Sequence, residues 1–265
     1  MTSVRSFLAS HPAVALVEVR EALGSTPREV GTWMLVSPDA IFGTIGGGQL
    51  EFMAIDRARE MIAGSVETDL LDIPLGPEIG QCCGGRVRID IALVDGALRA
   101  AIPERIDYEE SVRPHVYLFG GGHVGKALAE ALALLPLAVT VVETRAEAIH
   151  GFPETVTTRL TAIPEEEVRT ARAGSAFVVL THDHALDFLI VAQALERSDA
   201  AYVGMIGSAT KRATFRSWYL KTAGGSEEGL ARLVCPIGGT TVYDKRPTVI
   251  AAMTAAEVLA AILRK

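Results

Sequence analysis

The apolar residues of this 265-residue chain fall into short runs, and the spacing of these runs predicts its secondary structure. Before residue 95, runs with the length of single strands are separated by loops that carry glycine or proline. The strands predicted there are 13–19, 33–36, 66–73 and 86–94, and the helices are 1–10 and 49–62. This pattern favours a small domain that mixes helices and strands.

After residue 114, strand and helix patterns alternate regularly. The predicted strands are 116–119, 138–142, 155–159, 176–180 and 202–205, and the predicted helices are 125–135, 165–171, 186–196, 210–220 and 247–263. Such alternation is typical of a doubly wound parallel sheet, whose ligands bind at the carboxyl ends of the strands. We therefore predict an α/β protein with an N-terminal α/β domain at 1–95, a polar linker without clear periodicity at 96–114, and a Rossmann-like domain at 115–265.

A glycine motif follows the first strand of the second domain. Gly120, Gly122 and Gly125 have the spacing G-x-G-x-x-G, with His123 inside the motif and a helical pattern directly after it. Such glycines permit a tight turn and a close approach of backbone N–H groups to a phosphate. Glu143 ends the next strand, 18 positions after Gly125, where a ribose-binding carboxylate is expected. Alternatively, Glu143 is a surface residue that ends the strand by chance.

Two further turns lead into helices. Gly46, Gly47 and Gly48 precede the helix predicted at 49–62, and the backbone entropy that they cost favours close approach to another group over a plain corner. Gly207 and Ser208 precede the helix predicted at 210–220, which begins with Lys211 and Arg212. Cations at that end oppose the helix dipole unless they bind an anion, although both could also be ordinary surface residues.

Two adjacent cysteines lie between the last two predicted strands of the first domain, 66–73 and 86–94. Cys82 and Cys83 follow Gln81 and precede two glycines, so a large ligand could approach them. A thiolate there could ligate a soft metal, with Cys82 as the candidate, relay sulfur or contact a cofactor. The alternative is that both are small hydrophobic residues at a strand edge. A zinc site is disfavoured, because Cys235 is the only other thiol and no C-x-x-C pair is present.

The segment 181–184, Thr-His-Asp-His, ends the fourth predicted strand of the second domain. His182 and His184 would share a face if the strand continued, which would suggest a metal site. Alternatively, Asp183 caps the next helix and both rings face solvent. We favour a binding role for His182 and Asp183 without a metal.

Charge and composition narrow the function classes. Residues 1–113 contain 10 Arg, no Lys and 17 Asp and Glu, a net charge of −7, whereas residues 114–265 are neutral. Without a basic domain, nucleic-acid binding is disfavoured. No apolar run approaches the roughly 20 residues of a membrane span, and His11 and Pro12 interrupt the one stretch that could resemble a secretory signal. With three cysteines and no disulfide framework, we expect a cytoplasmic protein.

Several segments together resemble the XdhC/CoxI family over nearly the whole chain. They are GSTPR (24–28), GTIGGGQLE (43–51), QCCGG (81–85), FGGGHVG (119–125), THDH (181–184), GMIGS (204–208) with Lys211 and Arg212, and PIG (236–238). Relatives that serve other hydroxylases tend to continue Leu-Asp-Ile-Gly after the last motif. This chain continues GTTVYDKR (239–246), which is similar to the branch that serves xanthine dehydrogenase.

The resemblance implies a cofactor-insertion chaperone and not an enzyme. It implies that the chain binds the molybdenum cofactor (molybdopterin), shields it, supports its sulfuration by a cysteine desulfurase, and passes it to the xanthine dehydrogenase apoenzyme. We also expect a homodimer and no contact with nucleic acid or membrane. The residues expected to contact the cofactor are Gly46, Gly47, Gly48, Gln81, Cys82, Cys83, Gly120, Gly122, His123, Gly125, Glu143, His182, Asp183, Gly207, Ser208, Lys211 and Arg212.

Two other readings stay open. An NAD-dependent oxidoreductase would explain the 120–125 motif and Glu143, and His182 could serve as its acid or base. This reading leaves the 46–48 turn and the cysteine pair without a role. A regulatory dinucleotide sensor without chemistry would bind nucleotide and never molybdopterin.

Overall fold

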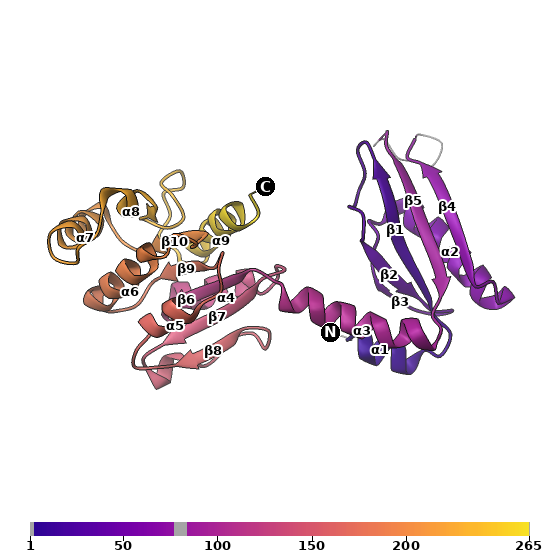
Figure 1. Ribbon diagram of the computed structural model, residues 1–265, viewed down its shortest axis with the longest axis horizontal. Helices are drawn as coiled ribbons and strands as arrows, with labels where there is room; N and C mark the ends of the chain where they lie inside the picture. The colour runs from indigo at the N-terminus through magenta and orange to yellow at the C-terminus, as the bar shows by residue number, and fades with distance from the viewer. Residues whose placement is uncertain (1–2, 77–83, 265) are drawn as a thin grey trace. The chain divides into compact units, whose positions relative to one another are not determined.

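The computed structural model describes residues 3–76 and 84–264, and the chain divides into two compact units, Met1–Glu109 and Glu110–Lys265 (Figure 1). Each unit has its own sheet and its own hydrophobic core, so each is described by itself.

The first unit is built on an antiparallel sheet with the strand order β3-β2-β1-β5-β4 within the described residues. Its elements are α1 (Val4–Ser10), β1 (Ala15–Leu23), β2 (Trp33–Val36), β3 (Ile41–Gly43), α2 (Gly48–Gly64), β4 (Thr68–Pro74), β5 (Arg86–Leu93) and α3 (Gly96–Ser111). Alternation along β1 turns Ala15, Val17 and Val19 towards α2, which covers one face of the sheet. Helices α1 and α3 pack on the other face around Leu35 and Ile102.

Residues 96–114, predicted from the sequence to be a polar linker without clear periodicity, contain the helix α3 over most of their length. Ile102 is the only fully buried residue of this helix, so its sequence carries little of the apolar periodicity that marks a helix. Strand β1 also runs beyond the predicted 13–19. Its second half pairs with β5 past a bulge after Val19 and is held there by ion pairs such as Arg20–Asp90, which apolar patterning does not reveal.

The second unit is a parallel sheet with the order β11-β10-β9-β6-β7-β8 within the described residues. Its strands are β6 (His115–Phe119), β7 (Ala138–Glu143), β8 (Thr157–Leu160), β9 (Ala176–Val179), β10 (Tyr202–Met205) and β11 (Leu233–Val234). Its helices are α4 (His123–Leu132), η2 (Ala146–Ala148), α5 (Glu165–Thr170), α6 (His184–Glu196), α7 (Ala209–Lys221), α8 (Glu227–Ala231) and α9 (Pro247–Ile262).

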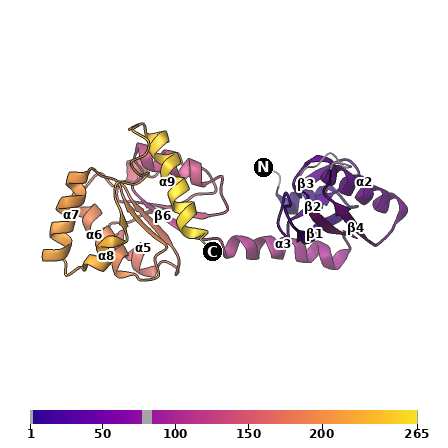
Figure 2. The ribbon, with the colours of Figure 1, turned by 90° about the horizontal axis from the view of Figure 1, so that it is seen from above.

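Helices cover both faces of this sheet, as Figure 2 shows. On one face, Leu128 of α4 and Val258 of α9 pack against Val116 and Val141. On the other face, Ile190 of α6 and Phe215 of α7 belong to the core that includes Phe119. The chain therefore crosses from one side of the sheet to the other between β6 and β9, which lie next to each other. A crevice for ligands is expected at that crossing, outside the carboxyl ends of the strands.

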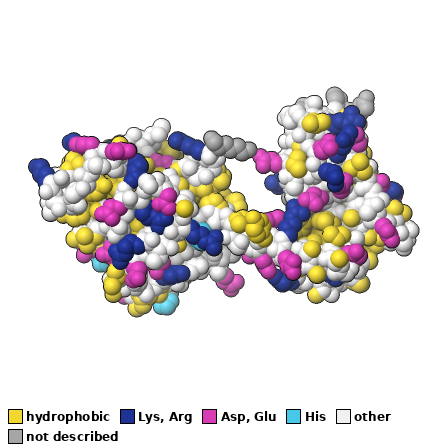
Figure 3. Space-filling view, in the orientation of Figure 1, with side chains coloured by type: hydrophobic (Ala, Val, Ile, Leu, Met, Phe, Trp, Pro, Cys, Tyr) yellow, Lys and Arg dark blue, Asp and Glu magenta, His cyan; other side chains and the backbone are white. Residues whose placement is uncertain are grey.

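The predicted fold class is confirmed: an α/β unit is followed by a Rossmann-like, doubly wound parallel sheet. The predicted strands and helices of the second unit are found with small shifts at their ends, while α8 and β11 were not predicted. No helix in the described ranges has both the length and the apolar character needed to cross a bilayer. On the face drawn in Figure 3, acidic and basic side chains are intermixed.

Candidate functional site

In the turn between β6 and α4, at the carboxyl edge of the parallel sheet, backbone segments approach one another closely. Gly120 has a φ of +125° and donates its N–H to the carbonyl of Val142 at 2.9 Å. A Cβ atom on Gly125 would collide with the carbonyl of Gly120, so the first turn of α4 lies directly on the loop. At Gly122, in contrast, a Cβ atom would meet open space. The glycines at either end of the motif therefore serve packing, while Gly122 faces outwards.

Glu143 lies buried beneath this turn. Its carboxylate accepts hydrogen bonds from the N–H groups of Gly121 (2.8 Å), Thr144 (2.9 Å) and Arg145 (3.1 Å), and from the Arg145 guanidinium at 3.0 and 3.1 Å. Burial alone would raise the pKa of Glu143, but the hydrogen bonds from Arg145 and Gly121 outweigh it and hold the pKa at about 2. Both carboxylate oxygens are engaged inside the protein. Glu143 thus positions the glycine turn and orients Arg145, instead of offering a free carboxylate to a ligand.

A cavity of about 540 Å³ opens above the turn. Its lining residues are Gly121, Gly122, His123, Val124, Gly125, Lys126, Arg145, Glu147, Ala148, Leu180, Thr181, His182 and Ile206. It brings together four of the predicted residues, Gly122, His123, Gly125 and His182, from two strand ends. Two cations, Lys126 and Arg145, and one acidic side chain, Glu147, line the cavity. Arg145 is already paired with the buried Glu143, so Lys126 and the N–H groups at the start of α4 are the groups left to bind an anion.

The prediction that Lys211 and Arg212 bind an external anion together does not match their positions. The ammonium group of Lys211 forms a buried ion pair with Asp187 and donates to the carbonyl of Ile206 at 2.9 Å. Asp187 in turn accepts from the N–H and the hydroxyl of Thr181 at 3.0 and 2.7 Å. A cation in the first turn of a helix opposes the helix dipole, and at Lys211 in α7 this is offset by the carboxylate of Asp187 in α6. Arg212 is exposed and lines a different surface cavity, beside Arg216 and α8.

The segment 181–184 adopts the capping arrangement. Asp183 is the N-cap of α6 and accepts from the N–H groups of Ala185 at 2.8 Å and Leu186 at 3.4 Å. His182 and His184 are both exposed, and His182 lines the 540 Å³ cavity. Within residues 3–76 and 84–264, no group of three or more His, Cys, Asp or Glu side chains is arranged to hold a metal ion.

Gly207 and Ser208 lie at a second cavity, of about 480 Å³, together with residues 236–245 and part of α9. The turn at Gly238 is held from below by Glu257, whose carboxylate accepts from the Gly238 N–H and from the Tyr202 hydroxyl, each at 2.9 Å. Burial and the neighbouring Glu257 raise the pKa of Tyr202, so this hydroxyl stays protonated and remains a donor.

In the first unit, the N–H groups of the turn at Gly46 and Gly47 are hydrogen-bonded to nearby side chains of the same motif. Glu51 accepts from the N–H groups of Ile45 at 3.0 Å and Gly47 at 3.1 Å, and from the Thr44 hydroxyl. Burial would raise the pKa of Glu51, but these hydrogen bonds lower it overall. This arrangement leaves Gly48 and the start of α2 as the part of the turn that could meet a ligand.

Three of the sequence motifs of the first unit meet at one place. A Cβ atom on Gly46 would contact Pro27 at 3.0 Å and Arg28 at 3.2 Å, and a Cβ atom on Gly24 would contact Gly85 at 3.3 Å. Gly85 is the last residue of the QCCGG motif. The predicted site residues Gln81, Cys82 and Cys83 lie outside the described residues. The described thiol, Cys235, is buried, and burial raises its pKa, so it is not poised as a thiolate.

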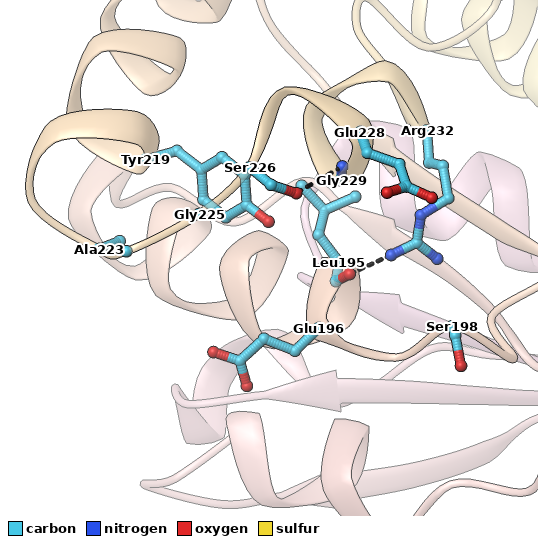
Figure 4. A pocket seen from close by; sticks show the side chains of 11 residues that line it. Leu195, Glu196, Ser198, Tyr219, Ala223, Gly225, Ser226, Glu228, Gly229 and Arg232 are labelled. Atoms are coloured by element: carbon cyan, nitrogen blue, oxygen red, sulfur yellow. Dashed lines mark hydrogen bonds between the residues drawn. The ribbon is translucent and has the colours of Figure 1, made fainter.

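A further cavity, of about 410 Å³, lies between the ends of α6, α7 and α8 (Figure 4). It contains Glu196 and Glu228, and the guanidinium of Arg232 donates there to the carbonyl of Leu195. Helix α6 leads into β10, so this cavity lies at the amino edge of the sheet, away from the glycine turn. Its arginine is taken up by backbone carbonyls, including that of Arg197 at 2.7 Å, and is not available to an anion.

Comparison with known proteins assigns both units to families of known sequence. The sequence model described as the XdhC Rossmann domain matches residues 116–258, and that of the XdhC and CoxI family matches residues 7–73. The chain belongs to the XdhC/CoxI family. The predicted resemblance is thereby confirmed, and the 540 Å³ cavity lies within the XdhC Rossmann domain.

Two similar proteins extend this finding. The uncharacterised protein YqeB of Escherichia coli K12 is 26% identical over 262 residues, which cover 92% of this chain but 43% of YqeB. A chain from Bacillus halodurans, described as a xanthine dehydrogenase, has a crystal structure similar to this XdhC-family chain, with a TM-score of 0.79 and 18% identity. That match covers 98% of this chain and 94% of the other, and it shows that the fold is shared.

The residues that shape the two cavities but were not predicted from the motifs include Lys126, Arg145, Tyr202 and Glu257. The position of Arg145 could have indicated a role, because it lies two residues after the strand end at Glu143, and ligands of such sheets bind at the strand ends. For Glu257 and Tyr202 the sequence held no such indication, since the hydrogen bond between them joins residues 55 positions apart. The sequence thus located the loops, but not the side chains that hold them.

Proposed function

We propose that this XdhC-family chain binds the molybdenum cofactor, protects it, supports its sulfuration and delivers it to xanthine dehydrogenase. Membership of the family supports an accessory role of this type. The observation that carries the proposal is the cavity of about 540 Å³ above the glycine turn, with Lys126 and Arg145 at its sides. Molybdopterin carries a phosphate, and such a cavity suits an anionic ligand.

The residues present fit this group. Gly122 lines the cavity, and a Cβ atom there would meet open space, so a ligand can approach the backbone closely. The first N–H groups of α4 have no acceptor within the helix. These N–H groups, Gly122 and Lys126 would hold the phosphate, and Glu143 would keep Arg145 in place. When bound, the cofactor supplies the molybdenum centre that the client enzyme uses. The role of this chain is to bind and orient the cofactor and to limit its contact with water.

Sulfuration requires a thiol near the cofactor or a partner that brings the sulfur. We propose that Cys82 or Cys83 supports this step, with a cysteine desulfurase as the sulfur donor. Of the adjoining residues, Gly85 packs against the backbone of Leu23 and Ser25, whereas a Cβ atom on Gly84 would meet open space. A large ligand would therefore approach the backbone at Gly84.

The test is copurification. The protein, expressed in a host that makes the cofactor, is oxidised, and molybdopterin is quantified as its fluorescent derivative. We expect bound molybdopterin in the unaltered protein and its loss in a Cys82→Ala/Cys83→Ala double variant. Full retention in the double variant would remove the cysteines from the mechanism, and absence of molybdopterin from the unaltered protein would contradict the proposed function.

One observation favours a second candidate, an NAD-dependent oxidoreductase. The strand order β8-β7-β6-β9-β10-β11 is the order of dinucleotide-binding sheets, and the glycine turn lies where such sheets bind pyrophosphate. Against it, the carboxylate of Glu143 is fully engaged by Gly121 and Arg145. Titration of NAD(H) followed by tryptophan fluorescence separates the two: micromolar binding favours the oxidoreductase.

A further inference from the structure

The second cavity at the carboxyl edge is built differently from the first. It holds about 480 Å³ between the loop that follows β10 and the segment 236–245, and α9 closes one side. Its walls are largely apolar side chains, namely Ile206, Pro236, Ile237, Val242, Val249, Ile250 and Met253. Such walls suit a flat, weakly polar group and not a phosphate.

An aromatic side chain stands at the rim of this cavity. Tyr243 lines it and is 100% exposed, and the adjacent Val242 is 45% exposed. A fully exposed ring next to an apolar cavity loses contact with water once a planar group stacks on it. This tyrosine has no packing role of its own, which separates it from the buried Tyr202 and Tyr219.

The segment that carries Tyr243 is held in place from two sides. The Oδ2 atom of Asp244 accepts from the Arg246 guanidinium at 2.6 and 2.9 Å. Its Oδ1 atom accepts from the guanidinium at 3.1 Å and from the Arg246 N–H at 2.8 Å. The preceding turn is held by Glu257 through the N–H of Gly238. Because Arg246 neutralises Asp244, Lys245 remains as the charged group at the cavity, and it forms no ion pair with another described residue.

The two cavities adjoin each other. Ile206, the residue after β10, lines both of them. The first cavity has cations and a glycine turn, and the second has apolar walls and an exposed ring. The two cavities therefore match the two kinds of group in a ligand that has an anionic end and a flat heterocyclic end.

We propose that the cavity beside Tyr243 is the binding site of a flat heterocycle of the pterin class, which stacks on the Tyr243 ring while its phosphate lies at Gly122 and Lys126. Lys245 faces the polar edge of the heterocycle. This proposal rests on the proposed function and adds where the ring system binds and which side chain recognises it.

The test compares Tyr243→Leu with Tyr243→Phe in the full-length protein. Molybdopterin released from a molybdoenzyme under anaerobic conditions is the probe. Its dissociation constant is measured by equilibrium dialysis, and the free and bound fractions are quantified afterwards as the oxidised, fluorescent derivative. Loss of an aromatic stacking partner should weaken binding by about tenfold. We expect this loss for Tyr243→Leu and near-unaltered binding for Tyr243→Phe, which keeps the aromatic ring.

Leu134→Ala, at an exposed position of the same unit outside both cavities, is the control and should bind as the unaltered protein does. Tyr243 and Leu134 both lie on the surface, so the melting temperatures of the variants should agree, and any loss of binding would not come from unfolding. Equal affinities of the unaltered protein and Tyr243→Leu would overturn this assignment and leave the proposed function standing. Absence of binding by the unaltered protein would overturn both.

Discussion

At the scale of single residues, three buried or half-buried carboxylates hold the loops at the carboxyl edge of the parallel sheet in place. Glu143 holds the turn at Gly121, Asp187 holds Thr181 and Lys211, and Glu257 holds Gly238. Each is engaged by donors inside the protein, and none faces a ligand as a free anion. Their role is to fix the loops, and the groups that remain for binding at the glycine turn are Lys126 and the backbone N–H groups at the start of α4.

The first residue-scale prediction concerns the acid side of the stability profile. The pKa of Glu143 is about 2 in the folded protein, below its ordinary value of 4.5. A carboxyl group whose pKa falls on folding stabilises the folded state above its unfolded pKa, and this contribution is lost as the pH falls from about 4.5 to about 2. Glu143→Gln should lower the free energy of unfolding at pH 7 by roughly 1–3 kcal/mol.

Urea unfolding at a series of pH values checks this prediction. The difference in unfolding free energy between the unaltered protein and Glu143→Gln should shrink as the pH falls through this window. Other carboxylates paired with arginine, such as Asp72, titrate equally in both proteins and cancel in the difference. A difference that stays constant from pH 7 to pH 2 would show that the charge of Glu143 does not hold the turn.

The second residue-scale prediction separates two neighbouring cations. Lys211→Met leaves Asp187 buried without its partner and should cost about 3–5 kcal/mol of stability. Arg212→Ala, at an exposed position, should stay within about 0.5 kcal/mol of the unaltered protein. Chemical denaturation of both variants measures this contrast, and equal effects would mean that Lys211 is not the buried member of the pair.

At the scale of elements, the strength of the apolar pattern decided what the sequence could predict. Strands β6, β7, β9 and β10 are almost wholly buried, and their apolar runs located them to within a residue or two. Helix α3 buries only Ile102, and β11 has two residues, so neither leaves a pattern to read. The glycine turn was predicted because its chemistry is local, whereas the roles of Glu143 and Lys211 depend on partners that only the fold brings near.

The element-scale prediction contrasts two glycines of the same turn. Gly125→Ala places a Cβ atom against the carbonyl of Gly120 and should lower the stability by about 1–3 kcal/mol. In Gly122→Ala the added methyl group meets open space, so this variant should be as stable as the unaltered protein. The methyl group would, however, occupy the place where a phosphate approaches the backbone.

Thermal unfolding and quantified molybdopterin, measured on both variants, check this contrast. We expect Gly122→Ala to keep its melting temperature and to lose most of the bound cofactor. If it retained the cofactor in full, the phosphate would not lie on this turn.

At the scale of the whole molecule, the chain contains two units that match two sequence models of one family. The chain spans 43% of the length of YqeB. The resemblance seen in the sequence rested on motifs from both units. The second unit now shows how its motifs meet at one sheet edge, with an anion-binding cavity beside an apolar one.

The most direct test of this account is a mass spectrum of the small molecule released from the purified, unaltered protein after expression in a host that makes molybdenum cofactor. The account predicts a molybdopterin species in an amount close to that of the protein. Release of NAD(H), or of no pterin at all, would contradict it.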